Sequence, residues 1–74
     1  MLTELIASVL DVAAEELNEE SGRGTLEAWD SLAHLNIVAA VEETFDVMFS
    51  STEMRELTSL GKLREALTSR NVEV

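Results

Sequence analysis

The sequence predicts an all-α fold, a small up-down bundle of three main helices and one short helix, with a long loop between the first and second helices. Apolar residues recur at helical spacing in three stretches, and capping residues precede the predicted helices. The chain has no proline and no alternating strand pattern. We expect one domain over residues 1–74. Because there is no cysteine, helix packing alone must hold this small domain together.

The first apolar stretch predicts a helix over residues 3–17, or about 3–15 in the assembled bundle. Thr3 can cap it, and Glu4 suits its first turn. The segment from Val12 to Leu17 either continues this helix or belongs to the following loop. The residues at positions i, i+3, i+4, i+7 and i+8 of the stripe are Leu2, Leu5, Ile6, Val9 and Leu10.

Residues 18–25 form the predicted loop, since they include two of the three glycines and show no periodicity. Acids cluster here, so the alternative to an ordinary connecting loop is a calcium-binding loop. However, Asp and Asn do not alternate, and no Glu closes a twelve-residue pattern. Leu26 and Trp29 are expected to fix the end of the loop to the bundle.

A long helix is predicted over residues 31–45, with Asp30 as its cap. A helical wheel places Ile37, Val38, Val41 and Phe45 in one arc, which is the expected buried stripe. The far side combines acidic, apolar and small residues, and no Lys or Arg occurs from Asp30 to Asp46. This face is either simply solvated or a docking surface for a basic, partly apolar partner. The far side comprises Leu32, Asn36, Ala39, Glu43 and Asp46, with Leu35 and Glu42 between the two sides.

Two helices are predicted in the C-terminal third. Ser50 and Glu53 have the spacing of a capping box and predict a short helix over about residues 51–56. Thr58 or Ser59 caps a last helix over residues 59–69, in which Gly61 suggests close packing. We expect residues 70–74 to fray. The side chains expected to pack inward here are Met48, Phe49, Met54, Leu60, Leu63, Ala66 and Leu67.

The charge narrows the range of partners. Five basic and fifteen acidic residues give a net charge of −10. Residues 1–54 hold twelve acids and one base, a balance of −11, whereas residues 55–74 hold four bases and three acids, a balance of +1. We therefore expect proteins with basic patches, and neither nucleic acid nor an anionic membrane, as partners. No apolar run approaches the roughly 20 residues of a membrane span, so we expect a cytoplasmic monomer without membrane insertion.

Ser31 is the residue of chemical interest, because its hydroxyl follows the Asp30 cap at the start of the long helix. Free N–H groups and the helix dipole favour a negatively charged substituent there. A hydrolase would need His34, the only histidine, as a base for Ser31. No second orienting acid accompanies the pair, and the chain has little volume for a substrate pocket. His34 also falls in the apolar arc, which favours a structural hydrogen bond.

Asp30-Ser31-Leu32 at the start of a long helix, in an acidic chain of this size, resembles the motif of acyl carrier proteins. The resemblance implies a carrier and not an enzyme. It implies that a phosphopantetheinyl transferase uses coenzyme A and Mg²⁺ to attach 4'-phosphopantetheine to Ser31, between Asp30 and Leu32. The arm would hold acyl groups as thioesters for acyl-processing enzymes with basic docking patches. The first helix of this family usually stops near Asp11, and Met48, Phe49 and Met54 would line a space for an acyl chain. The resemblance implies that Glu42, Glu43 and Asp46 form the acidic recognition stretch. The full set of expected docking residues is Leu32, Ala39, Glu42, Glu43, Asp46 and Glu53.

The chain departs from the fatty-acid carriers of this family. Those carriers usually have Gly two residues before the Asp and acids soon after the Ser. This sequence has Ala28, Ala33, His34 and Asn36 instead, and Trp29 replaces an aliphatic residue. The cargo pathway therefore stays open between fatty-acid, polyketide-like and lipid or cell-surface biosynthesis. A peptidyl or aminoacyl carrier and an unmodified acidic helical adaptor that binds a basic protein are the alternatives.

Overall fold

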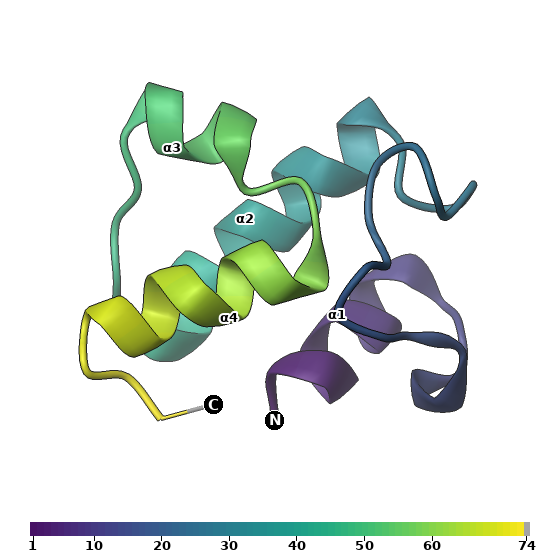
Figure 1. Cartoon of the computed structure of the whole chain (residues 1–74), viewed down its shortest axis with the longest axis horizontal. Coiled ribbons are helices and arrows are strands. Elements are labelled where there is room, and N and C mark those ends of the chain that lie inside the picture. The colour runs from purple at the N-terminus through teal and green to yellow at the C-terminus, as the bar shows by residue number, and fades with distance from the viewer. Residues whose placement is uncertain (74) are drawn as a thin grey trace.

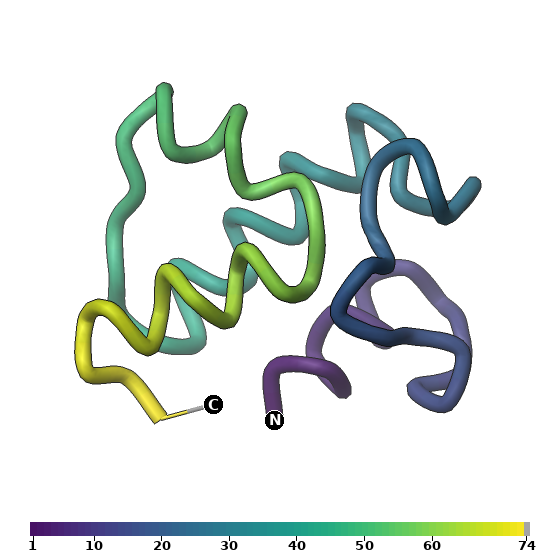
Figure 2. Tube along the Cα trace, in the orientation of Figure 1, coloured from purple at the N-terminus to yellow at the C-terminus, as the bar shows by residue number. Residues whose placement is uncertain are grey.

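The computed structural model describes residues 1–73 and confirms the all-α prediction (Figures 1 and 2). Its helices are α1 (Leu2–Leu10), α2 (Ser31–Phe45), α3 (Ser51–Glu56) and α4 (Leu60–Ser69), with one 3₁₀ turn, η1 (Ala14–Glu16). In Figure 1, α4 crosses in front of α2, while α3 lies above it and the long loop lies beside α1. Within residues 1–73 there is no strand, only an isolated antiparallel bridge between Gly22 and Ser59. No helix in this part of the chain combines the length and apolarity that crossing a bilayer requires.

Local capping chemistry sets the beginnings of three helices. The Asp30 carboxylate accepts a hydrogen bond from the Ala33 N–H at 2.8 Å and starts α2. Ser50 and Glu53 form the predicted capping box of α3, with bonds of 3.0 and 3.1 Å. Ser59, and not Thr58, caps α4. These bonds satisfy N–H groups that have no partner inside the helix.

The predicted extent of the first helix was wrong. α1 starts at Leu2 without a side-chain cap, and Thr3 instead accepts a hydrogen bond from Arg64 at 3.2 Å. The helix ends at Leu10 because Asp11 turns into the left-handed conformation, with φ 57°. The family's usual stop near Asp11 is therefore correct, and the apolar residues that follow belong to the loop.

The same closing motif ends three of the helices. Asp11, Asp46 and Asn71 are left-handed, and the valine after each donates its N–H back into the helix. These bonds run from Val12 to Ala7, from Val47 to Glu42 and from Val72 to Leu67, at 3.0 to 3.1 Å. Each valine also packs against the core, as a hydrophobic helix-closing motif requires. Residues 70–72 thus form a hydrogen-bonded turn that closes α4, and the fraying predicted for residues 70–74 stays a prediction; Val74 lies outside the described residues.

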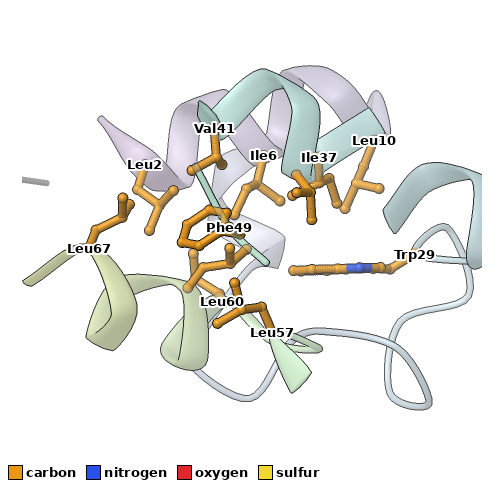
Figure 3. Packing of buried hydrophobic residues seen from close by; sticks show 12 residues of the cluster. Leu2, Ile6, Leu10, Trp29, Ile37, Val41, Phe49, Leu57, Leu60 and Leu67 are labelled. Atoms are coloured by element: carbon orange, nitrogen blue, oxygen red, sulfur yellow. The ribbon is translucent and has the colours of Figure 1, made fainter. Parts of the chain in front are cut away.

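One apolar core joins all the helices and the loop (Figure 3). The Trp29 ring enters it from the loop and points toward the aliphatic side chains of α2 and α4. Trp29 is 2% exposed, so the prediction that it fixes the loop is confirmed. One predicted core residue is wrong, since Met48 follows the closing turn of α2 and is 85% exposed. Phe45, Met54 and Ala66 are partly buried and pack against the core. The buried cluster comprises Leu2, Ile6, Leu10, Trp29, Ile37, Val38, Val41, Phe49, Leu57, Leu60, Leu63 and Leu67.

The long loop is held against the connection between α3 and α4. Leu60 N–H donates to the Ser21 carbonyl and Gly61 N–H to the Glu19 carbonyl, both at 2.9 Å. A Cβ on Gly61 would lie 2.9 Å from the Glu19 carbonyl oxygen, which confirms the close packing predicted for this glycine. A Cβ on Gly22 would lie only 1.9 Å from the Thr58 carbonyl oxygen. These contacts therefore hold the loop backbone close to the connection between α3 and α4.

Candidate functional site

Ser31 is the first residue of α2, and its side chain is exposed. The Asp30 backbone is extended, with φ −92° and ψ −172°, and its carboxylate binds the Ala33 N–H. The cap therefore fixes the direction in which the helix starts while leaving the neighbouring hydroxyl outside the core. An exposed hydroxyl on a rigid helix end is accessible to another protein.

Arg23 contacts this hydroxyl from the loop, a contact that the sequence analysis did not predict. Its Nη2 donates a hydrogen bond to Ser31 Oγ at 2.9 Å, across eight residues of sequence. The Arg23 backbone N–H donates to the Thr58 carbonyl at 3.0 Å. The loop thus brings a guanidinium group, which suits phosphate oxygens, to the side chain singled out in the sequence.

His34 and Trp29 form a buried polar pair beneath Ser31. Trp29 Nε1–H donates to His34 Nδ1 at 3.0 Å, and the ring centroids are 6.2 Å apart with 27° between their planes. Since Nδ1 accepts this bond, the imidazole proton is on Nε2, which donates to the Met54 carbonyl at 2.6 Å. His34 thereby joins the loop, α2 and α3. The predicted structural hydrogen bond of His34 is confirmed.

This pairing leaves no base for Ser31. Both ring nitrogens of His34 are occupied, one by the Trp29 indole and the other by the Met54 carbonyl. Ser31 instead contacts Arg23, a cation that cannot accept its proton. A hydrolytic mechanism needs a base within hydrogen-bond reach of the hydroxyl. The arrangement therefore lacks the parts of a serine hydrolase.

The surroundings of Ser31 do fit a phosphopantetheine group. The hydroxyl can form the ester, and the guanidinium beside it can compensate the charge of a phosphodiester. A mainly apolar hollow of about 370 Å³ opens beside Ser31. Its lining includes Arg23, His34, Leu35 and Met54. When bound, phosphopantetheine supplies a thiol that carries an acyl group as a thioester.

The comparison with protein families decides the assignment. A family described as "Phosphopantetheine attachment site" matches residues 2–67. The chain belongs to this family. It is accordingly an acyl-carrier-type protein with covalently attached 4'-phosphopantetheine, and it is a carrier and not an enzyme.

A solved structure supports the same assignment of the carrier. The chain is similar to the holo acyl carrier protein from Geobacter metallireducens, with a TM-score of 0.80 and 28% sequence identity. The match covers 92% of this chain and 78% of that chain. No curated protein matched the sequence significantly. As a carrier of this family, the chain interacts with acyl-processing enzymes.

The exposed face of α2 holds most of the predicted docking residues of the carrier. Leu32 is 69% exposed, and Ala39, Glu43 and Asp46 are also exposed. Glu42 is only half-buried, and its carboxylate accepts a hydrogen bond from the Phe49 N–H at 2.8 Å. It therefore has a structural role that the sequence did not reveal.

Glu53, the last predicted docking residue, lies on α3 and not on the face of α2. Its carboxylate binds Arg70 at 2.5 Å and also accepts the Ser50 N–H. The hydrogen bond from Arg70 is the main cause that lowers the pKa of Glu53. This carboxylate is thus already paired within the protein, whereas Glu43 and Asp46 are not in any ion pair within residues 1–73.

Three acids lie at the C-terminal end of α2, where the helix dipole is unfavourable for a negative charge. Glu42 and Glu43 are in its last turn, and Asp46 is its left-handed C-cap. The negative end of the helix dipole repels anions there, by about 0.3–1 kcal/mol each. No basic residue occurs in this last turn. Glu43 therefore lies where the helix dipole disfavours its charge, and no structural contact of its carboxylate offsets this within residues 1–73.

Proposed function

We propose that Ser31 is the attachment point of the arm and that residues 1–74 act as one carrier domain in the cytoplasm. The domain would present acyl thioesters to enzymes of fatty-acid, polyketide-like or lipid and cell-surface biosynthesis. The single observation that carries this proposal is the exposed Ser31 hydroxyl at the capped start of α2, within the matched family region. Asp30 orients this helix start, and Leu32 offers an apolar contact beside it.

The attachment reaction requires no catalytic group from the carrier itself. A phosphopantetheinyl transferase would supply the base and Mg²⁺, since no base contacts Ser31 in the described chain. Ser31 Oγ forms a bond to the pantetheine-bearing phosphorus of coenzyme A, and the phosphorus–oxygen bond to 3',5'-adenosine diphosphate breaks. The hydroxyl proton passes to the base of the transferase. The carrier contributes a fixed and accessible hydroxyl.

Intact mass spectrometry tests the attachment point. Incubation with coenzyme A and a broad-specificity transferase is expected to raise the mass by one phosphopantetheinyl group, and Ser31→Ala is expected to abolish the increase. Ser51→Ala is the matched control, because Ser51 is an exposed serine at the first position of α3. An unmodified native protein would reject the carrier proposal for Ser31 and favour the acidic adaptor. Modification of Ser31→Ala would place the arm on another residue.

We propose that the exposed face of α2 is the docking surface for the transferase and for acyl-processing enzymes with basic patches. Glu43→Lys is expected to slow association, with little change in the catalytic rate once bound, because opposite charges mainly accelerate encounter. Glu15→Lys makes the same charge change on an exposed residue of η1 and serves as the control. Added salt should reduce the difference between native protein and Glu43→Lys. Equal effects of the two variants would show that only net charge matters.

The cargo class needs a separate experiment. Loading of the modified protein with fatty acyl, polyketide-type and aminoacyl groups by their respective ligases would be compared by mass spectrometry. We expect acyl loading, and preferred aminoacyl loading would identify the peptidyl carrier alternative. Sedimentation of the modified carrier is expected to give a monomer, because the polypeptide's net charge of −10 opposes self-association.

A further inference from the structure

Arg23 is a basic residue in a strongly acidic part of the sequence. It is the only basic residue among residues 1–54, which include twelve acids. Yet its guanidinium forms no ion pair within residues 1–73, and its side-chain hydrogen bond goes to Ser31 Oγ at 2.9 Å. A neutral hydroxyl leaves the charge of the guanidinium uncompensated. The nearest carboxylate in sequence to Ser31, that of Asp30, accepts the Ala33 N–H with Oδ1 and forms no ion pair with Arg23.

Backbone hydrogen bonds hold Arg23 in place beside Ser31. Arg23 N–H donates to the Thr58 carbonyl at 3.0 Å, and the neighbouring Gly22 is paired with Ser59. Leu26 N–H closes the turn on the Gly22 carbonyl at 2.9 Å. A guanidinium on a fixed backbone loses less conformational entropy when it binds than one on a flexible segment.

We propose that Arg23 is a positioning residue that binds the phosphodiester of the prosthetic arm. This proposal rests on the attachment to Ser31 proposed above. The ester phosphorus is bonded to Ser31 Oγ, so its ionised oxygens lie next to the atom that Arg23 already contacts. Attachment replaces a hydrogen bond between a cation and a neutral hydroxyl with one between a cation and an anion, which is the stronger kind. Arg23 then fixes the direction in which the base of the arm leaves α2.

Three proteins test this proposal: the native chain, Arg23→Gln and Arg55→Gln. Arg55 is the matched control because it lines the same hollow as Ser31 and loses the same charge, but has no hydrogen bond to Ser31. Each protein is converted with coenzyme A and transferase, and mass spectrometry confirms the conversion. The melting temperature is then measured before and after conversion. Conversion is expected to change the melting temperature of the native protein more favourably, that is upward, than that of Arg23→Gln. The expected difference is about 2–4 °C for an exposed charge pair. Arg55→Gln is expected to match the native protein.

The ³¹P resonance of the phosphodiester gives a second measurement. It is expected to shift in Arg23→Gln, to be partly restored in Arg23→Lys and to stay unchanged in Arg55→Gln. If conversion is complete but the melting changes and ³¹P spectra agree among all proteins, the role of Arg23 is overturned while the carrier function stands. Equal effects of Arg23→Gln and Arg55→Gln would also overturn it, because they indicate net charge alone. If the native protein takes up no phosphopantetheine, the proposed attachment itself fails.

Discussion

His34 offers the most discriminating test of how the start of α2 is held. In His34→Leu an apolar side chain of similar size replaces the imidazole, and two polar groups lose their partner. These are the indole N–H of Trp29, which is 2% exposed, and the partly buried Met54 carbonyl. The variant thus separates hydrogen bonding from simple filling of space.

The expected loss follows from these two groups. Leaving one buried donor or acceptor unsatisfied costs about 1–3 kcal/mol, and two of them give about 2–4 kcal/mol when one is only partly buried. A domain of this size has a free energy of unfolding of roughly 4–11 kcal/mol. The substitution is therefore expected to remove a large fraction of the stability and to lower the melting temperature by about 10–25 °C.

Urea unfolding followed by circular dichroism measures this loss, and fluorescence gives a local signal because Trp29 is the only tryptophan. His34→Gln is the rescue variant, since its carbonyl oxygen can accept from the indole and its amide can donate to Met54. It is expected to recover more than half of the loss. A native-like midpoint for His34→Leu would refute the argument, as would a His34→Gln variant that is no more stable than His34→Leu.

Two further substitutions test the loop and the C-terminal turn. Gly22→Ala is expected to lose about 3 kcal/mol or more in urea unfolding, because its Cβ would lie 1.9 Å from the Thr58 carbonyl oxygen; a loss under about 0.5 kcal/mol would contradict this. Glu53→Gln removes a carboxylate whose pKa is lowered by the hydrogen bond from Arg70. A carboxylate with a lowered pKa stabilises the fold at neutral pH, where it is ionised. This stabilisation is lost as the pH falls below about 4 and the carboxylate is protonated. The native advantage over Glu53→Gln is therefore expected at pH 7 and should shrink on acidification; a constant difference from pH 7 to 3 would contradict it.

Local chemistry explains which helix boundaries could be predicted. The bounds of α2 and α3 were correct because Asp30 and the Ser50–Glu53 pair act within three residues of themselves. The end of α1 was missed because the apolar pattern continues past it. The available signal was Asp11 followed by Val12, the same Asx-Val pair that closes α2 and α4. Asp and Asn tolerate the left-handed conformation, and the valine then returns to the core.

The contacts around Ser31 could not be predicted in the same way. The hydroxyl itself was identified from its place after a capping residue, which is a local property. The Arg23 contact depends on how the loop packs on the connection between α3 and α4, where backbone bonds join residues far apart in the sequence. The bond from His34 to Met54 spans twenty residues. Helical periodicity predicts which side of a helix is buried, but not which polar group it meets there.

One side of α2 packs in the core and the other is the proposed docking surface, and Glu42 lies between them. Its carboxylate accepts the N–H of the buried Phe49 at 2.8 Å, so Glu42→Ala leaves this donor without its partner. We expect a loss of about 1–2 kcal/mol in urea unfolding, together with weaker docking. Glu43, which is exposed and has no such bond, should change docking alone. A double variant that reverses the charges of Glu42 and Glu43 would therefore combine a loss of stability with weaker docking. If Glu42→Ala has the same urea midpoint as the native protein, the bond to Phe49 does not stabilise the fold. Glu42 is then available for partner binding in the same way as Glu43.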